Sequence, residues 1–159
     1  MVTLERVEWD DPRAAGLRVE MDAEMGALYA SSTDGFSPER SAAVAAALAV
    51  RPEHIVATVL ALDGDKVVGH AALRPIDGAL EVKKVFVTAE ARGRGISRAI
   101  MRELEVIASE RNITRLVLQT GSRQPEAIGL YEAIGYRQIP VYEPYTVLAV
   151  ALCYDKVLH

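Results

Sequence analysis

The sequence predicts an α/β domain that spans residues 1–159. Strand-like and helix-like segments alternate along the chain, and neither repeats nor low-complexity tracts interrupt them. Half of the residues are hydrophobic, which suffices for one core in a chain of 159 residues. Near the middle, a β-branched run passes through a glycine-containing loop directly into a helix with apolar residues at helical spacing. These observations together indicate one domain.

The first third of the chain predicts one strand followed by two helices. Residues 3–9 alternate imperfectly between polar and apolar, which favours a strand. Asp11 and Pro12 start a helix whose apolar residues follow at helical spacing to about residue 30. Ser37 and Pro38 open a second, alanine-rich helix that ends near residue 49.

The remaining segments predict three strands, a helix, a strand, a helix and two strands. Residues 55–62 and 66–73 flank Asp63-Gly64-Asp65, a pattern typical of a hairpin. Gly135 marks the end of the last helix. The other expected elements are strands over residues 80–87, 116–119, 136–139 and 147–154 and helices over 96–110 and 125–134.

The charge balance argues against nucleic acid and membrane partners. The chain has 18 basic and 22 acidic side chains and a formal net charge of −4, so no overall field attracts a polyanion or an anionic lipid surface. Arg92 and Arg94 form a small basic group, but no aromatic residues alternate with them and Glu90 is close by. No apolar run approaches the ~18 residues of a membrane span, and the first residues do not resemble a leader. We therefore expect a cytoplasmic protein.

Cysteine and histidine are too few for a disulfide framework or a metal site. Cys153 is the single cysteine and lies in an apolar run, so we expect a buried, inert thiol. His54, His70 and His159 are scattered along the chain, and we expect no metal cofactor. The sequence leaves open whether the chain forms a homodimer.

Residues 85–101 form the segment around which the rest of the chain is organised. Gly93 and Gly95 let the backbone turn sharply and approach a ligand, and the free N–H groups of the following helix point into the same loop. Such a loop binds an anion, and Arg92, Arg94 and Arg98 add positive charge around it. Glycines are also common here where a turn is merely tight, so that alternative stays open. The segment fits neither a Walker loop nor a dinucleotide fingerprint.

The loop resembles the signature of the GNAT acetyltransferase superfamily. That signature reads Gln or Arg, two residues, Gly, one residue, then Gly or Ala; Arg92, Gly95 and Ser97 fill these places, with Ser97 as a departure. The resemblance implies that the loop holds the pyrophosphate of acetyl-coenzyme A. The cofactor-binding residues that it implies are Val85, Phe86, Val87, Arg92, Gly93, Arg94, Gly95, Ile96, Ser97, Arg98 and Gln124.

A second stretch, residues 119–136, strengthens the resemblance. GNAT enzymes commonly carry Asn three residues before Ala, then Leu-Tyr-Glu and Gly-Phe or Gly-Tyr; here Gln124 replaces the Asn, and Tyr131 and Gly135 fit. The resemblance implies a mixed, mostly antiparallel central sheet, flanked by helices and splayed between its fourth and fifth strands. It also implies that Tyr131 acts as a general acid toward the coenzyme A thiolate, whereas the alternative role is helix packing.

Glu81 is the candidate general base. It lies eleven residues before Arg92, which resembles the position of the base in several GNAT members. An alkyl ammonium has a pKa near 10, and only the neutral amine attacks a thioester, so the reaction needs a base. Strand periodicity places Glu81, Lys83, Val85 and Val87 on one face. The alternatives are that Glu81 pairs with Lys83 or another cation, or orders a water.

Four other residues are candidates for the lining of the site. In the resembling enzymes the amide at the position of Val87 lies beside the thioester carbonyl, where it would act as an oxyanion donor. His70 either lines the acceptor pocket or is a half-buried, hydrogen-bonded residue. Tyr142 and Tyr145 either form a wall of the acceptor site or cap the sheet.

The resemblance to GNAT enzymes implies an acetyl-CoA-dependent N-acetyltransferase. The expected reaction is direct attack of an amine, from a small molecule or a peptide, on the thioester in a ternary complex. Cys153 has no adjacent base in the sequence that would favour an acyl-enzyme. The alternatives are a non-catalytic CoA-binding or sensing module, and an acyltransferase that uses another acyl-CoA or a hydroxyl acceptor. No motif identifies the acceptor.

Overall fold

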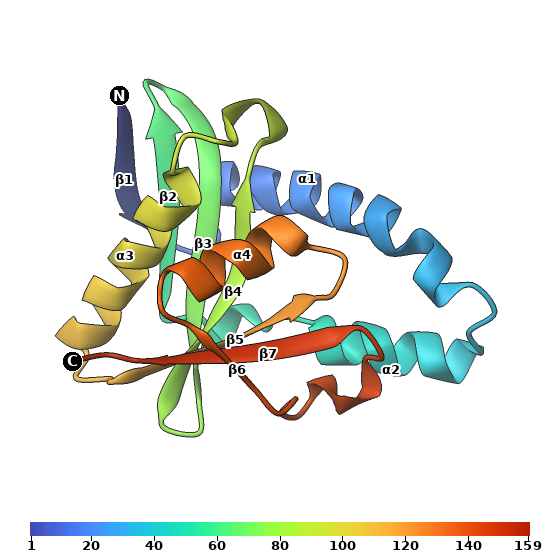
Figure 1. Cartoon of the computed structure of the whole chain (residues 1–159). Helices are drawn as coiled ribbons and strands as arrows, with labels where there is room; N and C mark the ends of the chain where they lie inside the picture. Colours follow the sequence, from blue (N-terminus) through green and yellow to red (C-terminus); the bar gives the residue numbers. More distant parts are fainter.

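A seven-stranded sheet of order β1-β2-β3-β4-β5-β7-β6 carries the fold in the computed structural model, which describes residues 1–159 (Figure 1). Only β4 and β5 are parallel; all other neighbours are antiparallel. The predicted element order and the mixed, mostly antiparallel sheet are therefore confirmed. The strands are β1 (Val2–Val7), β2 (Ala57–Asp63), β3 (Lys66–Ile76), β4 (Ala79–Val87), β5 (Arg115–Gly121), β6 (Arg137–Ile139) and β7 (Ala151–Val157).

Helices cover both faces of this sheet (Figure 1). The helices are α1 (Pro12–Tyr29), α2 (Pro38–Leu48), α3 (Ile96–Glu110) and α4 (Pro125–Ala133). The larger apolar core packs α3 against the sheet, and a smaller one packs α1 against β2 and Phe86 of β4. The Asp11 carboxylate caps α1 and the Ser37 hydroxyl caps α2, each accepting a backbone N–H of the first turn. None of these helices combines the length and the apolarity that crossing a membrane requires.

The end of the chain differs from its expected strand boundaries. The last strand begins at Ala151 rather than at residue 147, because Tyr145–Val147 forms a 3₁₀ turn. The Tyr145 side chain is completely buried and hydrogen-bonded to Lys83 and Arg74, which holds the segment against the sheet. A tertiary contact of one side chain therefore overrides the strand propensity of the segment.

A β-bulge interrupts β4. His70 pairs with Phe86 and Ala72 with Lys83, so two residues of β4 lie opposite the single residue between them on β3. Lys84, one of the two, has a left-handed backbone with φ +57°. A non-glycine residue in this region marks a conformation that the surrounding structure must hold in place.

The bulge reverses which side chains of β4 face each side of the sheet. Val82 and Val87 both belong to the core under α3, whereas Phe86 packs on the α1 side. The expectation that Glu81, Lys83, Val85 and Val87 share one face is therefore wrong, because one extra residue shifts the alternation beyond Lys83.

The pairing of β4 with β5 is short. It joins three residue pairs, from Leu80 with Leu116 to Val82 with Leu118. Beyond Val82, β4 continues to Val87 and β5 continues to Gly121 without pairing with each other. In Figure 1, β5 and β7 cross the direction of β1 to β4. The sheet therefore opens between β4 and β5, as the resemblance implied.

Candidate active site

Two cavities meet where β4 and β5 separate. The first, which we call the loop cavity, has a volume of about 840 Å³ and lies at the glycine loop and α4. The second, which we call the apolar cavity, has a volume of about 410 Å³ and lies against α1 and α2. Met25, Val85, Gln124 and Tyr131 line both. A ligand in one cavity would therefore contact a ligand in the other at these residues.

The loop cavity collects the residues expected to bind the cofactor. All of them except Arg94 line it: Val85, Phe86, Val87, Arg92, Gly93, Gly95, Ile96, Ser97, Arg98 and Gln124. Gly95 has φ +75° and is the N-cap of α3, and no atom lies within 4 Å of where its Cβ would be. The first N–H groups of α3 have no acceptor within the helix. The backbone therefore presents free amides beside open space, which suits an anion.

The arginines of this region are not equivalent. Arg92 donates from Nε to the Val87 carbonyl (3.0 Å) and from Nη2 to both oxygens of Glu24 (2.8 and 2.7 Å). Arg94 pairs with Asp63 at 2.7 Å and does not line the cavity. Arg98 lines the cavity and has no ion-pair partner. Arg98 is therefore the arginine of the loop whose charge remains available to a ligand.

Tyr131 lies at the junction of the two cavities. Its side chain is 5% exposed and packs near Tyr136 and Tyr154, with ring centroids 5.9 and 6.5 Å away. Its hydroxyl makes no hydrogen bond within the chain. Burial raises the pKa of the Tyr131 phenol above its usual value, because the phenolate loses hydration. The hydroxyl therefore stays protonated and free to donate a hydrogen bond to a ligand.

Glu81 lies in a group that we call the buried charged cluster: Glu81, Arg74, Lys83, Tyr142 and Tyr145. Oε1 of Glu81 accepts from Arg74 Nε at 2.7 Å, and Oε2 accepts from the Tyr142 hydroxyl at 2.6 Å. Lys83 Nζ donates to the Tyr145 hydroxyl at 2.7 Å and lies 4.0 Å from Glu81. Glu81 is completely buried and lines neither cavity.

This geometry bears on the alternatives stated for Glu81, Tyr142 and Tyr145: ion pairing or proton abstraction for Glu81, and capping or lining the acceptor site for the two tyrosines. Glu81 pairs with a cation, Arg74, and both of its oxygens are engaged. Tyr142 and Tyr145 cap the charged cluster and line neither cavity. Sequence reasoning missed Arg74, although it lies directly opposite Glu81 once β3 and β4 are paired. The hairpin register, which the sequence does not specify residue by residue, was the missing information.

His70 is hydrogen-bonded at both ring nitrogens. Nε2 lies 3.0 Å from Arg18 Nη1 and Nδ1 lies 2.8 Å from the Lys84 carbonyl. Because a guanidinium only donates, Nε2 accepts and the Nδ1–H donates to Lys84, the residue at the bulge. Burial lowers the pKa of His70 to about 4; the hydrogen bond to the Lys84 carbonyl opposes this shift, and the nearby Arg18 and Lys84 charges add to it. His70 thus holds the bulge by its hydrogen bond to the Lys84 carbonyl, and it lines neither cavity.

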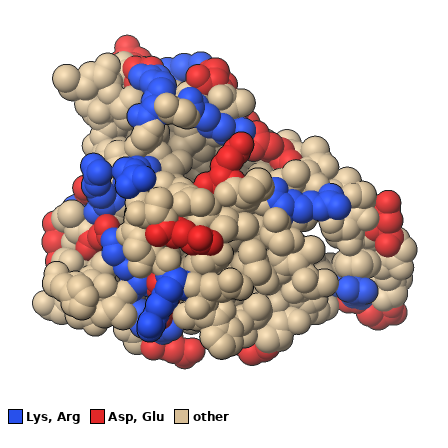
Figure 2. Space-filling view, in the orientation of Figure 1, with Lys and Arg blue, Asp and Glu red and all other residues tan.

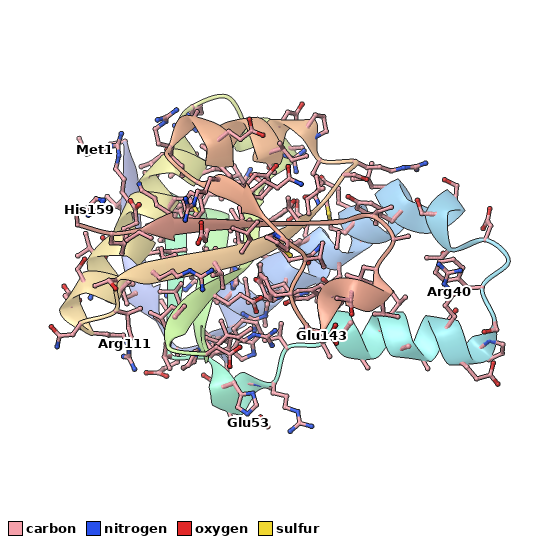
Figure 3. The ribbon with its side chains drawn as sticks, turned by 60° about the horizontal axis from the view of Figure 1, so that its bottom comes forward. Met1, Arg40, Glu53, Arg111, Glu143 and His159 are labelled. Carbon is pink, nitrogen blue, oxygen red and sulfur yellow. The ribbon has the colours of Figure 1, made fainter.

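The apolar cavity is built by segments that are far apart in the sequence. Its apolar lining includes Met21 and Tyr29 of α1, Val44 and Leu48 of α2, and Leu148 of the segment before β7. Lys83 and the exposed ion pair of Lys84 with Asp22 (3.1 Å) supply the charges. In Figure 3 the loop carrying Glu143 lies beside the C-terminal half of α2, which closes this side of the molecule. No local motif encodes this arrangement.

The acidic and basic side chains on the face seen in Figure 2 are interspersed, with no field of a single sign. This distribution agrees with the net charge of −4. The positive charge that bears on the site is local: Arg98 and Arg123 line the loop cavity without a carboxylate partner, and Lys83 lines the apolar cavity.

Solved structures share this fold over nearly the whole chain. A Klebsiella pneumoniae protein named for acyl-CoA N-acyltransferase activity has a TM-score of 0.78 and 23% identity, covering 100% of this chain and 99% of its own. The PaiA N-acetyltransferase of Thermoplasma acidophilum, solved with coenzyme A, has a TM-score of 0.69 and 13% identity, covering 99% of both chains. At these identities the likeness concerns the fold.

Relatives in sequence match over shorter stretches. N-acetyltransferase family 8 member 2 of Rattus norvegicus is 32% identical over 89 residues, which cover 52% of this chain and 39% of the rat protein. An IAA acetyltransferase of Azospirillum brasilense is 32% identical over 90 residues, covering 57% of this chain and 59% of that protein. This chain thus matches less than two thirds of either relative. The model of the "Acetyltransferase (GNAT) family" matches residues 21–136, more than two thirds of this chain. The chain therefore belongs to the GNAT acetyltransferase family.

Proposed function

We propose that the protein transfers the acetyl group of acetyl-CoA directly to an amine in a ternary complex. The observation that carries this proposal is the meeting of the two cavities at Val85 and Tyr131. One cavity has the free amides and two arginines without ion pairs, Arg98 and Arg123, which suit a pyrophosphate, and the other is walled mainly by apolar side chains. A thioester and an amine entering from opposite sides would meet at the junction, where their proximity favours reaction.

The substrate acetyl-CoA fits the loop cavity on two grounds. The left-handed Gly93 and Gly95 leave open space before the amides of α3, so the backbone can approach a pyrophosphate closely. Arg98 adds a charge that no carboxylate of the chain neutralises. Val87, at the end of β4, lines the same cavity, and we propose its amide as the oxyanion donor.

In this mechanism the protein forms no covalent bond to either substrate. The amine nitrogen attacks the thioester carbonyl carbon, and the C–S bond breaks as the tetrahedral intermediate collapses. The positively charged nitrogen loses a proton to water, the thiolate takes a proton, and the group that donates it is reprotonated from water. We propose that the Tyr131 hydroxyl donates to the departing sulfur, since it is protonated, has no protein partner and lines both cavities.

Glu81 has a supporting role in this proposal. Its oxygens accept hydrogen bonds from Arg74 and Tyr142, so direct proton abstraction would require one of these contacts to break. We propose that Glu81 fixes Arg74 and Tyr142, and that the amine enters neutral or loses its proton to water. Direct proton transfer to Glu81 is the alternative that its substitution tests.

The experiment is a screen of amines with acetyl-CoA that follows thiol release. We expect thiol release that depends on the amine, with the N-acetyl product identified by mass spectrometry. Binding of CoA without thiol release for any amine would favour the non-catalytic CoA-binding module instead. Faster release with hydroxyl acceptors or with a longer acyl-CoA would favour the other alternative.

A further inference from the structure

The buried charged cluster carries one more positive charge than negative charge. Arg74 and Lys83 are its cations and Glu81 is its only carboxylate. Glu81 accepts from Arg74 at 2.7 Å, while Lys83 is 4.0 Å away and has only the Tyr145 hydroxyl at close range. Lys83 therefore shares the Glu81 carboxylate with Arg74, at the longer distance of 4.0 Å, although its side chain is only 8% exposed.

A buried cation without a close counterion is costly, because burial removes its hydration. The lowered pKa of Lys83, about 8 through desolvation, expresses this cost. An anionic group of a ligand, placed beside Lys83, would offset this free-energy cost. Lys83 is also the residue of the cluster that lines the apolar cavity, where the acceptor is expected.

The rest of the apolar cavity restricts the acceptor further. Its other charges, Asp22 and Lys84, pair with each other at 3.1 Å. No unpaired carboxylate lines the cavity, so it offers no partner for a second cationic group such as that of a polyamine. Met21, Phe36 and Leu48 are among the residues that would surround an uncharged, apolar body.

The spacing along β4 decides where the anionic group lies relative to the amine. Lys83 precedes Val85, which lines both cavities, by two residues. Two residues of a strand span about 6–7 Å, and the bulge shortens this path. Lys83 and the junction are therefore close along β4, so one small acceptor can place its anionic group near Lys83 and its amine near the junction.

We propose that the acceptor is an α-amino acid with an apolar side chain, whose carboxylate pairs with Lys83 while its side chain fills the apolar cavity. This inference rests on the proposed acetyl transfer and names its substrate class. Lys83 is a specificity residue in this account, and it acts on the acceptor by an ion pair that excludes amines lacking a carboxylate.

The test compares L-phenylalanine with phenethylamine, which lacks only the carboxylate, and includes spermidine. We expect kcat/KM for phenylalanine to exceed that for phenethylamine by at least about tenfold. Lys83→Met should remove this preference, raising KM for phenylalanine at least about tenfold and leaving phenethylamine within about threefold. Lys66→Met, which removes a lysine paired with Glu90 at the surface, should change neither substrate.

Lys83→Met is expected to fold. Glu81 keeps its bonds from Arg74 and Tyr142, and the Tyr145 hydroxyl keeps its bond from Arg74, so no buried group loses its last partner. Acetylation of phenethylamine or spermidine at least as fast as phenylalanine overturns the amino-acid proposal and leaves acetyl transfer intact. An equal loss for both substrates in Lys83→Met also overturns it. Absence of thiol release with every amine overturns acetyl transfer, and this proposal with it.

Discussion

The loop cavity and the apolar cavity share four residues but are built in different ways. The loop cavity is lined mainly by residues close together in the sequence, at the end of β4, the glycine loop and the start of α4, with three residues of α1. The apolar cavity and its charged cluster are formed by side chains from α1, α2, β3, β4 and the segment before β7. The glycine loop and the free amides of α3 thus belong to the half of the site expected to be general, and side chains distant in the sequence build the half expected to be selective.

This difference between the two cavities predicts different effects for substitutions in each of them. A change in the loop cavity alters backbone conformation and should affect CoA binding with any acceptor. A change in the charged cluster alters side-chain pairing, so it should affect stability or acceptor choice and leave CoA binding intact. Substitutions at the junction, by contrast, should affect turnover while both substrates still bind.

The largest expected effect belongs to the junction. Tyr131→Phe should lower turnover about 10- to 10³-fold at saturating substrates, because the hydroxyl that donates to the departing sulfur is lost while the ring still packs. Stability and CoA affinity should change little. Tyr136→Phe is the matched control: its hydroxyl is buried in the same aromatic group, has no hydrogen bond and lines neither cavity. Near-normal turnover in Tyr131→Phe would exclude the acid role.

In the charged cluster, Glu81→Gln should lower the free energy of unfolding by about 2–3 kcal/mol. The substitution leaves Arg74, whose side chain is 13% exposed, without a carboxylate. Glu103→Gln, which breaks an exposed pair with Arg6, should cost less than about 1 kcal/mol. Chemical denaturation measures both. A turnover loss of about 10²-fold at low pH, with stability unchanged, would instead identify Glu81 as the base.

His70, which is hydrogen-bonded to the bulge, should make the free energy of unfolding depend on pH in the acid range. Its pKa is about 4 in the folded protein against 6.5 for the free side chain, so between these values the unfolded chain binds a proton that the folded chain does not. Stability is therefore complete above pH 6.5 and falls by about 3 kcal/mol as pH decreases to about 4. His70→Gln should flatten the curve of unfolding free energy against pH over this window. A parallel curve for the variant would show that other groups cause the loss.

The two halves of the site also differ in how far the sequence predicts them. The glycine loop and the Leu-Tyr-Glu stretch are each continuous in the sequence and carry the family resemblance, and the residues that the resemblance implied all line the loop cavity except Arg94. Their binding of the cofactor stays a prediction. Arg94 could not be placed because its partner Asp63 comes from the β2–β3 hairpin. The element order was predictable from periodicity for the same local reason.

Three features could not be predicted from the sequence because they depend on contacts that form only in the assembled sheet. The bulge at Lys84 depends on support from His70 and Arg18, which are distant in the sequence, and it reversed the expected faces of β4. The pairing of Arg74 with Glu81 depends on hairpin register. The 3₁₀ turn at Tyr145 depends on burial against Lys83. Each is a tertiary contact that outweighs a local preference.

The glycine loop tests the central claim, that backbone amides at the start of α3 hold the pyrophosphate of CoA. Gly95→Val places a branched side chain where the ligand would approach and strains a residue at φ +75°. Gly78→Val is the matched control, since Gly78 has φ +79° and open space but lies at the opposite end of β4. Calorimetric titration of CoA into the folded variants should show affinity weakened at least tenfold, about 1.4 kcal/mol, in Gly95→Val and unchanged in Gly78→Val. Unchanged affinity in folded Gly95→Val would contradict the claim.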